Sequence, residues 1–484
     1  MVMDDLGWGD LGFFGNPNRD TPHIDRMASE GMVFTDFYSG APLCSPCKAA
    51  LLTGRLPIRN GFYTTNAHAR NSYTPQEIIG GIVNETLLSE LLSEEKHLGH
   101  QLQFLPTNHG FHEYFGSTNC HFGPYNNKDT PNIPFFRNGN MIGRYYEDFA
   151  ITPEGESNIT QLLITEAIET LQNFSKTSQS FFLYWAPDSM HGPVYASKYF
   201  IGKSPKGRYG DAVREVDDGI GQILETLKST GLDKNTFVFF LSDNGAALVD
   251  KAAAGSNGPL LCGKQTTFEG GMRVPGIAWW PSKIKPGQVT YQTATVMDLF
   301  STILDFANAS VPSNKVYDGH SLKQTLLYGK IEDRQVFSII SKPIFFYRGN
   351  ELFAVRYGFH KLHLWTWTNS IKQFYTGIDF CPGQQVENVT THEQLNHTAN
   401  PIMFNLGHDP SERFPLNPAS LEYQSKLPIF RQLISDHKMH LDPGIPQLNW
   451  CDAAVMHWQP PGCQKLKRCL PKPPSKPYKC DWPH

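Results

Sequence analysis

The sequence predicts an α/β fold with a largely parallel central sheet flanked by helices, joined to a smaller antiparallel C-terminal domain. Residues 181–186 and 236–241 are apolar throughout, which is typical of strands buried on both faces of a sheet. Between them, residues 211–227 carry apolar side chains at helical spacing, so the order is strand, helix, strand. This order is typical of parallel sheets covered by helices. Polar residues follow both apolar runs directly, at the carboxyl ends of strands where open α/β sheets bind ligands.

The pattern changes from about residue 341. Short apolar segments separated by Gly349 and Gly358 predict an antiparallel meander, and residues 422–437 are predicted to form a helix. A chain of 484 residues exceeds what one hydrophobic core usually serves. We therefore predict three parts: an N-terminal domain over residues 1–340, an antiparallel domain over 341–446 and a tail over 447–484.

Composition and charge narrow the class of protein. With 40% hydrophobic and 18% charged residues, the chain should fold into a globular protein. A formal net charge of -4 gives no reason to expect a nucleic-acid partner. No apolar run in the sequence approaches the length that spans a bilayer, so we expect no membrane partner either.

Cysteines and glycosylation triplets indicate the cellular compartment. Four of the nine cysteines fall within the last 34 residues, which are rich in proline. A tail stapled by disulfides is the main interpretation, and a zinc cluster is the alternative. Six Asn-x-Ser/Thr triplets permit glycosylation, at Asn84, Asn158, Asn173, Asn308, Asn388 and Asn396. These features favour the oxidising secretory pathway. The first residues have neither the charged nor the apolar part of a signal peptide. Either the chain is a processed or truncated form or its gene model starts late, and we favour the second interpretation.

Two pairs of oxygen-bearing side chains predict a metal site. Asp4 and Asp5 follow a short apolar start, and Asp243 and Asn244 follow the apolar run at 236–241. Carboxylate and amide oxygens are the ligands that Ca²⁺ or Mg²⁺ requires. Read alone, an Asp-Asn-Gly triplet is more often a turn than a metal site, so this assignment depends on the rest of the sequence.

The segment from Leu43 to Arg55, which reads LCSPCKAALLTGR, is the most informative in the chain. Without its context, Cys44 and Cys47 form a Cys-x-x-Cys pair that predicts a redox or metal-binding site. With its context, the segment resembles the signature of the type I sulfatases, Cys-x-Pro-Ser/Ala-Arg. Further motifs similar to that family occur in order along the chain, namely DDLGWGD from Asp4, HLGH from His97, HGP from His191, DNG from Asp243 and GKQ from Gly263.

The resemblance implies an alkaline-phosphatase-like fold and a sulfatase activity. It implies that the formylglycine-generating enzyme converts Cys44 into formylglycine, which acts beside one calcium ion, and that the ion is held by Asp4, Asp5, Cys44, Asp243 and Asn244. Lys264 would then bind the sulfate, and His191 would serve the leaving oxygen. His97 would act on the formylglycine side, where Lys48 would supply positive charge.

Further expectations come from the same resemblance. Tyr73, His100 and Lys96 would bind substrate, and Asn158 would carry a glycan. The implied disulfides pair Cys262 with Cys381, Cys451 with Cys480, and Cys463 with Cys469. The implied substrates are 6-sulfated N-acetylgalactosamine or galactose units of the glycosaminoglycans chondroitin sulfate and keratan sulfate, and the implied protein is a lysosomal homodimer.

The chain departs from the family pattern at three points. Cys47 stands where Ser or Ala is usual, Lys48 stands where Arg is usual, and the segment before His97 is shortened as if a core strand were missing. These departures motivate an alternative function, that of a catalytically weakened or inactive sulfatase-like protein that binds sulfated glycans. A third hypothesis is a phosphatase or phosphodiesterase that uses two zinc ions on the same fold.

Overall fold

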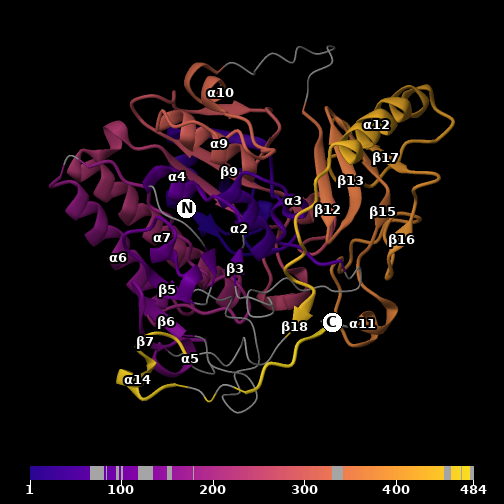
Figure 1. The fold of residues 1–484 in the computed structure, drawn as a ribbon. Helices are drawn as coiled ribbons and strands as arrows, with labels where there is room; N and C mark the ends of the chain where they lie inside the picture. The colour runs from indigo at the N-terminus through magenta and orange to yellow at the C-terminus, as the bar shows by residue number, and fades with distance from the viewer. Residues whose placement is uncertain are drawn as a thin grey trace.

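The structure is a computed structural model, and it has a central sheet between helices with a second sheet beside it (Figure 1). The residues that it describes are 1–65, 81–82, 84–93, 98–99, 102–117, 134–149, 155–177, 179–329, 342–451, 459–469, 471 and 473–479. In Figure 1, helices α6 and α7 (magenta) lie along one flank, and the second sheet (orange) with helix α12 (yellow) lies along the opposite flank.

The central sheet is largely parallel, as predicted. Its strands lie in the order β1-β8-β9-β2-β10, with β11 also paired to β2. Strand β1 is parallel to β8, and both β10 and β11 are parallel to β2, whereas β9 is antiparallel to β8 and β2. Five of these six strands therefore run the same way. Their bounds are β1 Val2–Met3, β2 Met32–Tyr38, β8 Val238–Ser242, β9 Arg273–Trp279, β10 Gln288–Thr290 and β11 Ala294–Thr295.

One expected strand is wrong. The apolar run at 236–241 forms β8, but residues 181–186 form no strand. The backbone carbonyl of Trp185 accepts a hydrogen bond of 2.9 Å from the amide of Val2, so this segment does lie beside β1. Strand β1 has only two residues, which is too short to support a ladder of backbone hydrogen bonds with its neighbour.

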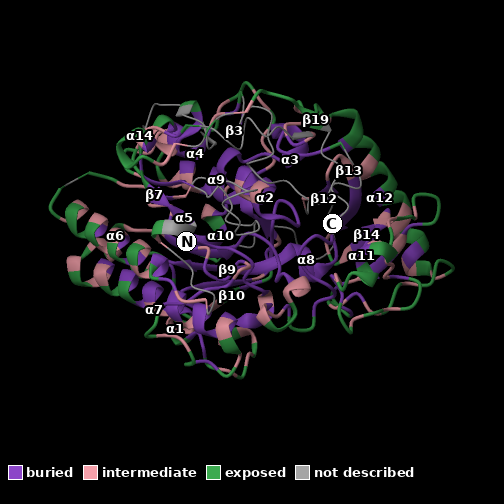
Figure 2. Cartoon of the chain, turned by 90° about the horizontal axis from the view of Figure 1, so that it is seen from below, coloured by how far each residue is buried: buried purple, intermediate pink, exposed green. Residues whose placement is uncertain are grey.

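Alternate residues of the central strands face two separate layers of helices. Val33 and Phe240 pack in one cluster with α1, α6 and α7, whereas Phe34 and Phe239 pack in another with α2 and α9. This alternation follows from the two-residue repeat of a strand. The helices are α1 Pro22–Glu30, α2 Cys44–Thr53, α6 Ile159–Phe174, α7 Gly207–Thr230 and α9 Val296–Phe306. Buried residues fill the centre around α2 and β9, and exposed ones lie on the outer sides of helices such as α6 (Figure 2).

The second sheet is the antiparallel meander that the sequence predicts. Its order is β12-β13-β14-β17, and every neighbouring pair is antiparallel. The bounds are β12 Ile344–Arg348, β13 Glu351–Tyr357, β14 His360–His363 and β17 Ile402–Asn405. Gly349 and Gly358 have positive φ in the turns between the strands, where glycine is favoured. Helix α12 (Leu421–Met439) confirms the helix predicted over 422–437.

The two sheets share buried contacts. Tyr347 and Val355 of the second sheet belong to the same apolar cluster as Phe34 of the first sheet and Ala50 of helix α2. The domain limit expected at residue 340 falls outside the described residues, so the domain limits stay a prediction.

The remaining elements are short. They are η1 Trp8–Asp10, η2 Gly12–Phe14, α3 Pro57–Asn60, β3 Gly81–Ile82, α4 Leu88–Ser93, β4 Leu98–Gly99, η4 Leu102–Phe104, η5 Pro106–Asn108, β5 Phe115–Ser117, β6 Pro134–Arg137, β7 Asn140–Arg144, α5 Tyr145–Asp148, η6 Leu232–Asn235, η7 Leu248–Ala253, α8 Glu269–Met272, α10 Lys323–Tyr328, β15 Trp365–Thr366, α11 Ile371–Tyr375, β16 Leu395–Asn396, β18 Trp450–Cys451, α14 Cys463–Leu466 and β19 Tyr478–Lys479.

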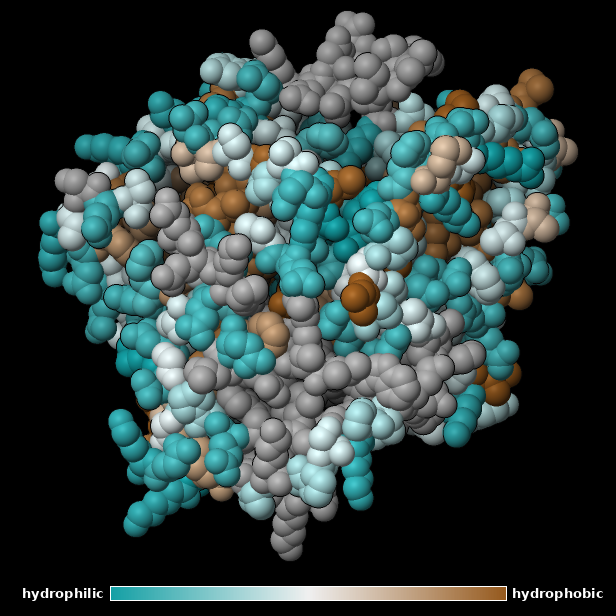
Figure 3. Space-filling model, in the orientation of Figure 1, coloured by the Kyte–Doolittle hydropathy of each residue, from teal (hydrophilic) through white to brown (hydrophobic). Residues whose placement is uncertain are grey.

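Two of the three expected disulfides are present, Cys262–Cys381 and Cys463–Cys469. Cys480 lies outside the described residues, so its pairing with Cys451 stays a prediction. Hydrophilic side chains cover most of the coloured surface in Figure 3, with hydrophobic ones between them. Among the described helices, none has both the length and the apolar character needed to cross a membrane.

Candidate active site

Three segments bring the predicted metal ligands and the signature cysteine to one end of the central sheet. Asp4 and Asp5 follow β1, and Asp243 and Asn244 follow β8, so both pairs lie beyond the carboxyl ends of adjacent parallel strands. The amide of Asp5 donates to Oδ1 of Asp243 over 3.3 Å. Asp5 has φ 61°, a left-handed conformation that aspartate tolerates better than most residues.

Cys44 is the first residue of α2. Leu43 before it is extended, and Pro46 lies in the first turn, where a missing backbone N–H costs no helical hydrogen bond. The helix ends at Gly54, whose positive φ of 67° is typical of a glycine cap. The loop between β2 and α2 is held by Ser39, whose hydroxyl donates to the carbonyl of Asp243 over 2.5 Å. Cys44 is thereby fixed beside the Asp243 strand end.

The structure gathers Asp4, Asp5, Cys44 and His191 into one buried cluster. One ligand atom from each lies within 4.8 Å of the others. His191 follows the 181–186 segment, and its Nε2 lies 3.7 Å from Oδ2 of Asp5. Its Nδ1 lies 2.8 Å from the carbonyl oxygen of Gly192. Because a carbonyl only accepts, Nδ1 carries a proton there, and Nε2 faces the cluster.

Two lysines lie among the three carboxylates. Lys48 Nζ forms an ion pair with Asp4 and another with Oδ2 of Asp243, the latter at 2.9 Å. Lys264 Nζ lies 2.7 Å from Oδ1 of Asp5 and 2.9 Å from Oδ2. These ammonium groups, of which that of Lys264 is buried and that of Lys48 is half-buried, offset most of the carboxylate charge.

The surroundings shift the pKa values of Asp4 and Asp243 in opposite directions. Burial raises the pKa of Asp4, but Lys48, His191 and Lys264 outweigh burial and hold that pKa well below its usual value. Burial and the nearby carboxylate of Asp4 raise the pKa of Asp243 to about 7. Although burial opposes it, attraction to Asp243 and Asp4 raises the pKa of Lys48, so Lys48 stays charged.

The two thiols are protonated. Burial and the carboxylate of Asp4 raise the pKa of Cys44 well above its usual value, and burial with Asp243 raises the pKa of Cys47 to about 12. Both are free and buried, and Cys47 packs in the apolar cluster beneath α2. Redox and metal-binding cysteine pairs work as thiolates, so these surroundings do not favour that interpretation of Cys44 and Cys47.

The donor set fits a hard cation. Oδ1 of Asp4 and Oδ1 of Asn244 are buried and have no hydrogen-bond partner in the part of the chain that the structure describes. The amide nitrogen of Asn244 donates to Oδ1 of Asp5 over 2.7 Å, which leaves its oxygen toward the remaining space. Unsatisfied buried oxygens are costly, and a calcium-class ion would satisfy them.

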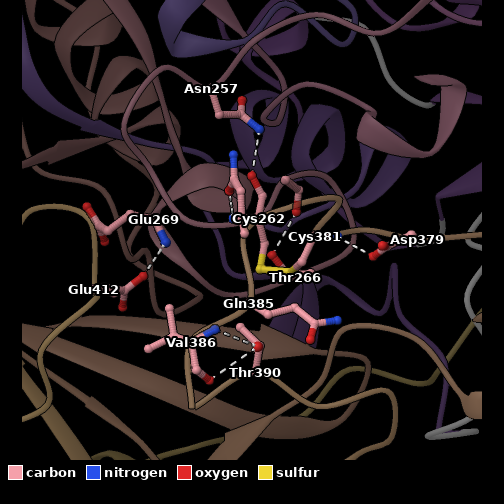
Figure 4. The surroundings of a disulfide bond; sticks show 12 residues. Asn257, Cys262, Thr266, Glu269, Asp379, Cys381, Gln385, Val386, Thr390 and Glu412 are labelled. Carbon is pink, nitrogen blue, oxygen red and sulfur yellow. Dashed lines mark hydrogen bonds between the residues drawn. A yellow bond between two sulfur atoms is a disulfide. The ribbon is translucent and has the colours of Figure 1, made fainter. Parts of the chain in front are cut away.

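The loop that carries Lys264 is tied to loops of the C-terminal part of the chain. Figure 4 shows the disulfide from Cys262, two residues before Lys264, to Cys381. It also shows the amide of Glu269 donating to Glu412 over 2.6 Å. Glu269 begins α8, and the carbonyls of Gly271 and Met272 in α8 accept from the amides of Gly245 and Ser39. Glu412, in a loop of the C-terminal part of the chain, therefore contacts α8, and α8 contacts both loops that bear the site.

Several predicted residues lie outside the described residues. These are Tyr73, Lys96, His97 and His100, together with the shortened segment before His97. Asn158 lies exposed at the start of α6, and its glycosylation stays a prediction.

Sequence reasoning missed two residues at the site. Ser39 fixes the loop before Cys44, and a single serine after a strand gives no distinctive signal. The hydroxyl of Tyr184 is buried and has no hydrogen-bond partner among the described residues, and burial raises its pKa well above the usual value while Lys48 and Asp243 act on it as well. The signal for Tyr184 was its place as the one side chain with a hydroxyl group in the apolar run 181–186.

Comparison with known proteins gives the family. The sequence model described as Sulfatase matches residues 1–309, and the one described as the C-terminal region of aryl-sulfatase matches residues 341–471. N-acetylgalactosamine-6-sulfatase from Rattus norvegicus is 58% identical over 496 aligned residues, covering 100% of this chain and 93% of the relative. The Homo sapiens protein of that name is 56% identical with the same coverage, and arylsulfatase A from Bos taurus is 34% identical, covering 86% and 82%.

Solved structures agree with this result. The PsFucS1 sulfatase from Pseudoalteromonas sp. superposes with a TM-score of 0.72 at 25% identity, covering 92% of this chain and 91% of that one. Ps i-CgsB superposes with a TM-score of 0.69 at 25% identity, covering 92% and 93%. The resemblance found in the sequence is thus confirmed, together with the alkaline-phosphatase-like fold. The chain belongs to the sulfatase family and is a sulfatase, an enzyme that hydrolyses sulfate esters.

Proposed function

We propose that this sulfatase removes 6-sulfate from N-acetylgalactosamine or galactose units of chondroitin sulfate and keratan sulfate. The observation that carries this proposal is the 56–58% identity over the whole chain to proteins named N-acetylgalactosamine-6-sulfatase. Arylsulfatase A is only 34% identical. The scattered loops that shape a sugar pocket fall within the aligned region, which supports a shared substrate.

The cofactors belong to the proposal as well. Asp4, Asp5, Asp243 and Asn244 would hold calcium, which supplies positive charge to the sulfate oxygens when it is bound. Cys44 would be the residue converted to formylglycine, whose hydrate supplies the attacking oxygen. Its place at the amino end of the ten-residue helix α2 supports this role, because that end of a helix stabilises negative charge.

The chain's own residues supply the remaining steps. Lys264 and Lys48 stand on two sides of the carboxylate cluster, where their ammonium groups would attract the sulfate and offset the charge that develops as the S–O bond breaks. His191 would donate a proton from Nε2 to the leaving sugar oxygen when its ring is doubly protonated, since Nδ1–H is bonded to Gly192 and Nε2 is the nitrogen left to exchange a proton. The carbonyl of Gly192 thereby orients the acid.

The alternative of an inactive paralogue is not favoured. Lys48 keeps a cation on both Asp4 and Asp243, and Cys47 is packed in the apolar cluster as a protonated thiol. A two-zinc phosphatase would need a second metal site, and the described residues contain one cluster of such ligands. Processing in the secretory pathway is supported by the two disulfides. The lysosome and the homodimer stay predictions.

The decisive experiment uses protein secreted from cells that contain the formylglycine-generating enzyme. We expect the mass of the Cys44 peptide to show the aldehyde, and we expect hydrolysis of 6-sulfated N-acetylgalactosamine in preference to its 4-sulfated isomer. Cys44→Ala is the matched control and should abolish turnover. A thiol in every copy with no turnover would contradict the proposal, and preference for the 4-sulfate would contradict its regiospecificity.

A further inference from the structure

Residues 248–250, which follow Asn244 along the chain, contact the two loops that carry Lys264 and His191. Gly263, beside Lys264, lies against Leu248, because a Cβ added at Gly263 would lie 3.0 Å from Cγ of Leu248. Gly192, beside His191, lies against Asp250, because a Cβ added there would lie 2.8 Å from Oδ2 of Asp250. Residues 248–250 are therefore wedged between the sulfate-binding loop and the loop of the proposed acid.

The same segment also meets the second sheet's side of the molecule. Val249 packs with Ile378 on the apolar cluster of Phe353, Trp367 and Phe380. The next cation, Lys251, places Nζ 3.2 Å from where a Cβ on Gly377 would lie. Because Cys381 is bonded to Cys262, this stretch of chain is fixed beside the Lys264 loop. Lys251 thus lies between the outer edge of the site and the loop that carries Gly377.

Lys251 has a strained backbone conformation. It interrupts η7 with φ 56° and ψ -113°, which is a sparsely populated region for a residue other than glycine. The residue is exposed, and it has no ion pair with any residue in the described part of the chain. A strained position that carries an unpaired cation at the edge of a site is a candidate for ligand binding.

An exposed aromatic residue lies two positions before Gly377, the glycine that Lys251 approaches. Tyr375 ends α11 two residues before Gly377, and 81% of its surface is exposed. The neighbouring Phe374 packs against the tilted ring of His392, with 4.2 Å between ring centres. An exposed aromatic ring on a fixed helix offers an apolar face to the C–H face of a sugar. A cation beside it selects for sugars that bear a carboxylate or a sulfate.

We propose that Lys251 and Tyr375 form a subsite for the sugar next to the one that loses its sulfate, with Lys251 pairing with an anionic group and Tyr375 stacking on the ring. This inference rests on the proposed function, because the anionic group is the uronate carboxylate or neighbouring sulfate of a glycosaminoglycan chain. In the part of the chain that the structure describes, no ion pair joins Lys251 to either of the nearby acids, Asp250 and Asp379. The carboxylate of Asp250 faces Gly192, and that of Asp379 accepts from the amide of Cys381.

The test compares KM on two substrates. One is a 6-sulfated N-acetylgalactosamine monosaccharide, and the other is an oligosaccharide in which this sugar is linked to a uronate. We expect Lys251→Gln to raise KM for the oligosaccharide by about threefold, the size expected of one exposed ion pair, without changing kcat or the monosaccharide kinetics. Lys251→Arg should retain the wild-type KM. Tyr375→Ala should raise the oligosaccharide KM as well, and Tyr375→Phe should not.

Lys283→Gln is the matched control. Lys283 is exposed and follows Trp279, whose partner in the sheet is Val238 at the amino end of β8, so it lies at the end of the sheet opposite the site. An oligosaccharide with a neutral neighbour separates charge from stacking, because only Tyr375→Ala should then raise KM. A sulfated neighbour in place of the uronate shows which anion Lys251 prefers.

Two results would overturn the subsite. One is an unchanged oligosaccharide KM in Lys251→Gln, and the other is an equal rise for the monosaccharide. If the wild-type enzyme hydrolysed no 6-sulfate at all, the proposed function would fail separately. Calorimetric binding of the same oligosaccharide to wild type and to Lys251→Gln would then decide the subsite, since equal Kd values would overturn it and a weaker Kd for the variant would support it.

Discussion

Lys48 is the residue on which this chain departs most visibly from the family signature, and the structure gives it a definite task. Its ammonium group reaches both Asp4 and Asp243, so one side chain compensates two ligands of the proposed cation site. A guanidinium could span the same two carboxylates with two separate N–H groups. Lysine provides the charge without that forked geometry.

Substitution of Lys48 should separate charge from shape. We expect Lys48→Met to lower kcat about tenfold or more, because a cation beside the developing negative charge is lost. The same variant should bind calcium more tightly, because the ammonium no longer competes for Asp4 and Asp243. Lys48→Arg is the matched control and should keep at least the wild-type kcat. Sulfatase kinetics and a calcium titration measure the two effects, and full kcat in Lys48→Met would contradict the role.

Asp217 should make stability depend on pH. Its carboxylate accepts from the amides of His23 and Ile24 at the start of α1, and burial raises its pKa to about 7. A carboxyl whose pKa is raised on folding stabilises the protein most below its unfolded value, and this contribution is lost as the pH rises through 7. Asp217→Asn should therefore gain Tm relative to wild type more at pH 8 than at pH 5. Asp442→Asn, at an exposed position away from Asp217, is the control, and an equal Tm difference at both pH values would contradict the assignment.

The residues of the site were predictable to different extents. Asp4, Asp5, Asp243, Asn244 and Cys44 could be chosen because their types and motifs are distinctive. Ser39 and Tyr184 could not, because their roles come from tertiary contacts that leave no local pattern.

At the scale of elements, the Cys262–Cys381 disulfide should stabilise the folded protein more than Cys463–Cys469 does. It closes a separation of 119 residues, whereas Cys463–Cys469 closes only 6. Loop-closure entropy gives about 4.8 kcal/mol for the longer loop and about 2 kcal/mol for the shorter one. We expect Cys381→Ser to lower Tm clearly more than Cys469→Ser, as measured by scanning calorimetry. The first variant should also raise KM, because Lys264 lies two residues from Cys262.

A similar loss of Tm in both cysteine variants would contradict the loop-length argument. An unchanged KM in Cys381→Ser would show that the Lys264 loop keeps its place without the bond.

Elements with strong periodicity were the ones that sequence could predict. Helix α7 and the meander of β12 to β14 have clear spacing of apolar residues and glycine turns, and both formed as predicted. Residues 181–186 are as apolar as β8, but a strand also needs a partner of sufficient length, and β1 offers two residues. The sequence of residues 181–186 gives no information about the length of the strand that lies beside them.

At the scale of the whole molecule, a buried set of charges joins the two sheets. Lys361 on β14 lies 2.9 Å from Glu269 on α8 and 3.2 Å from Glu412, and all three side chains are fully buried. Glu412 also lies 2.6 Å from Nε2 of His363. Nothing local in the sequence marks these residues as neighbours, since they are brought together only when the two sheets pack. This contact between sheets was the part of the fold that sequence could not predict.

Removing the central cation should destabilise the protein strongly. We expect Lys361→Met to cost about 3–5 kcal/mol in the free energy of unfolding, because it removes the ammonium group that two buried carboxylates share. Denaturant unfolding measures the loss. Adding Glu412→Gln to Lys361→Met should recover part of it, since one of the two carboxylates that lost their shared cation is then neutral. A loss below about 1 kcal/mol in Lys361→Met would contradict the assigned role of the network.

The burial of Cys44 has a consequence for how the enzyme is made. Only 3% of this residue is exposed once Asp4, Asp243 and α2 have closed around it, yet Asp243 is synthesised about 200 residues later. At ribosomal speeds of roughly 5–20 residues per second, the thiol stays open to a modifying enzyme for about 10 to 40 seconds. We therefore expect maturation to compete with folding during translation, so that slower synthesis yields a larger active fraction and a folded thiol form can no longer be rescued.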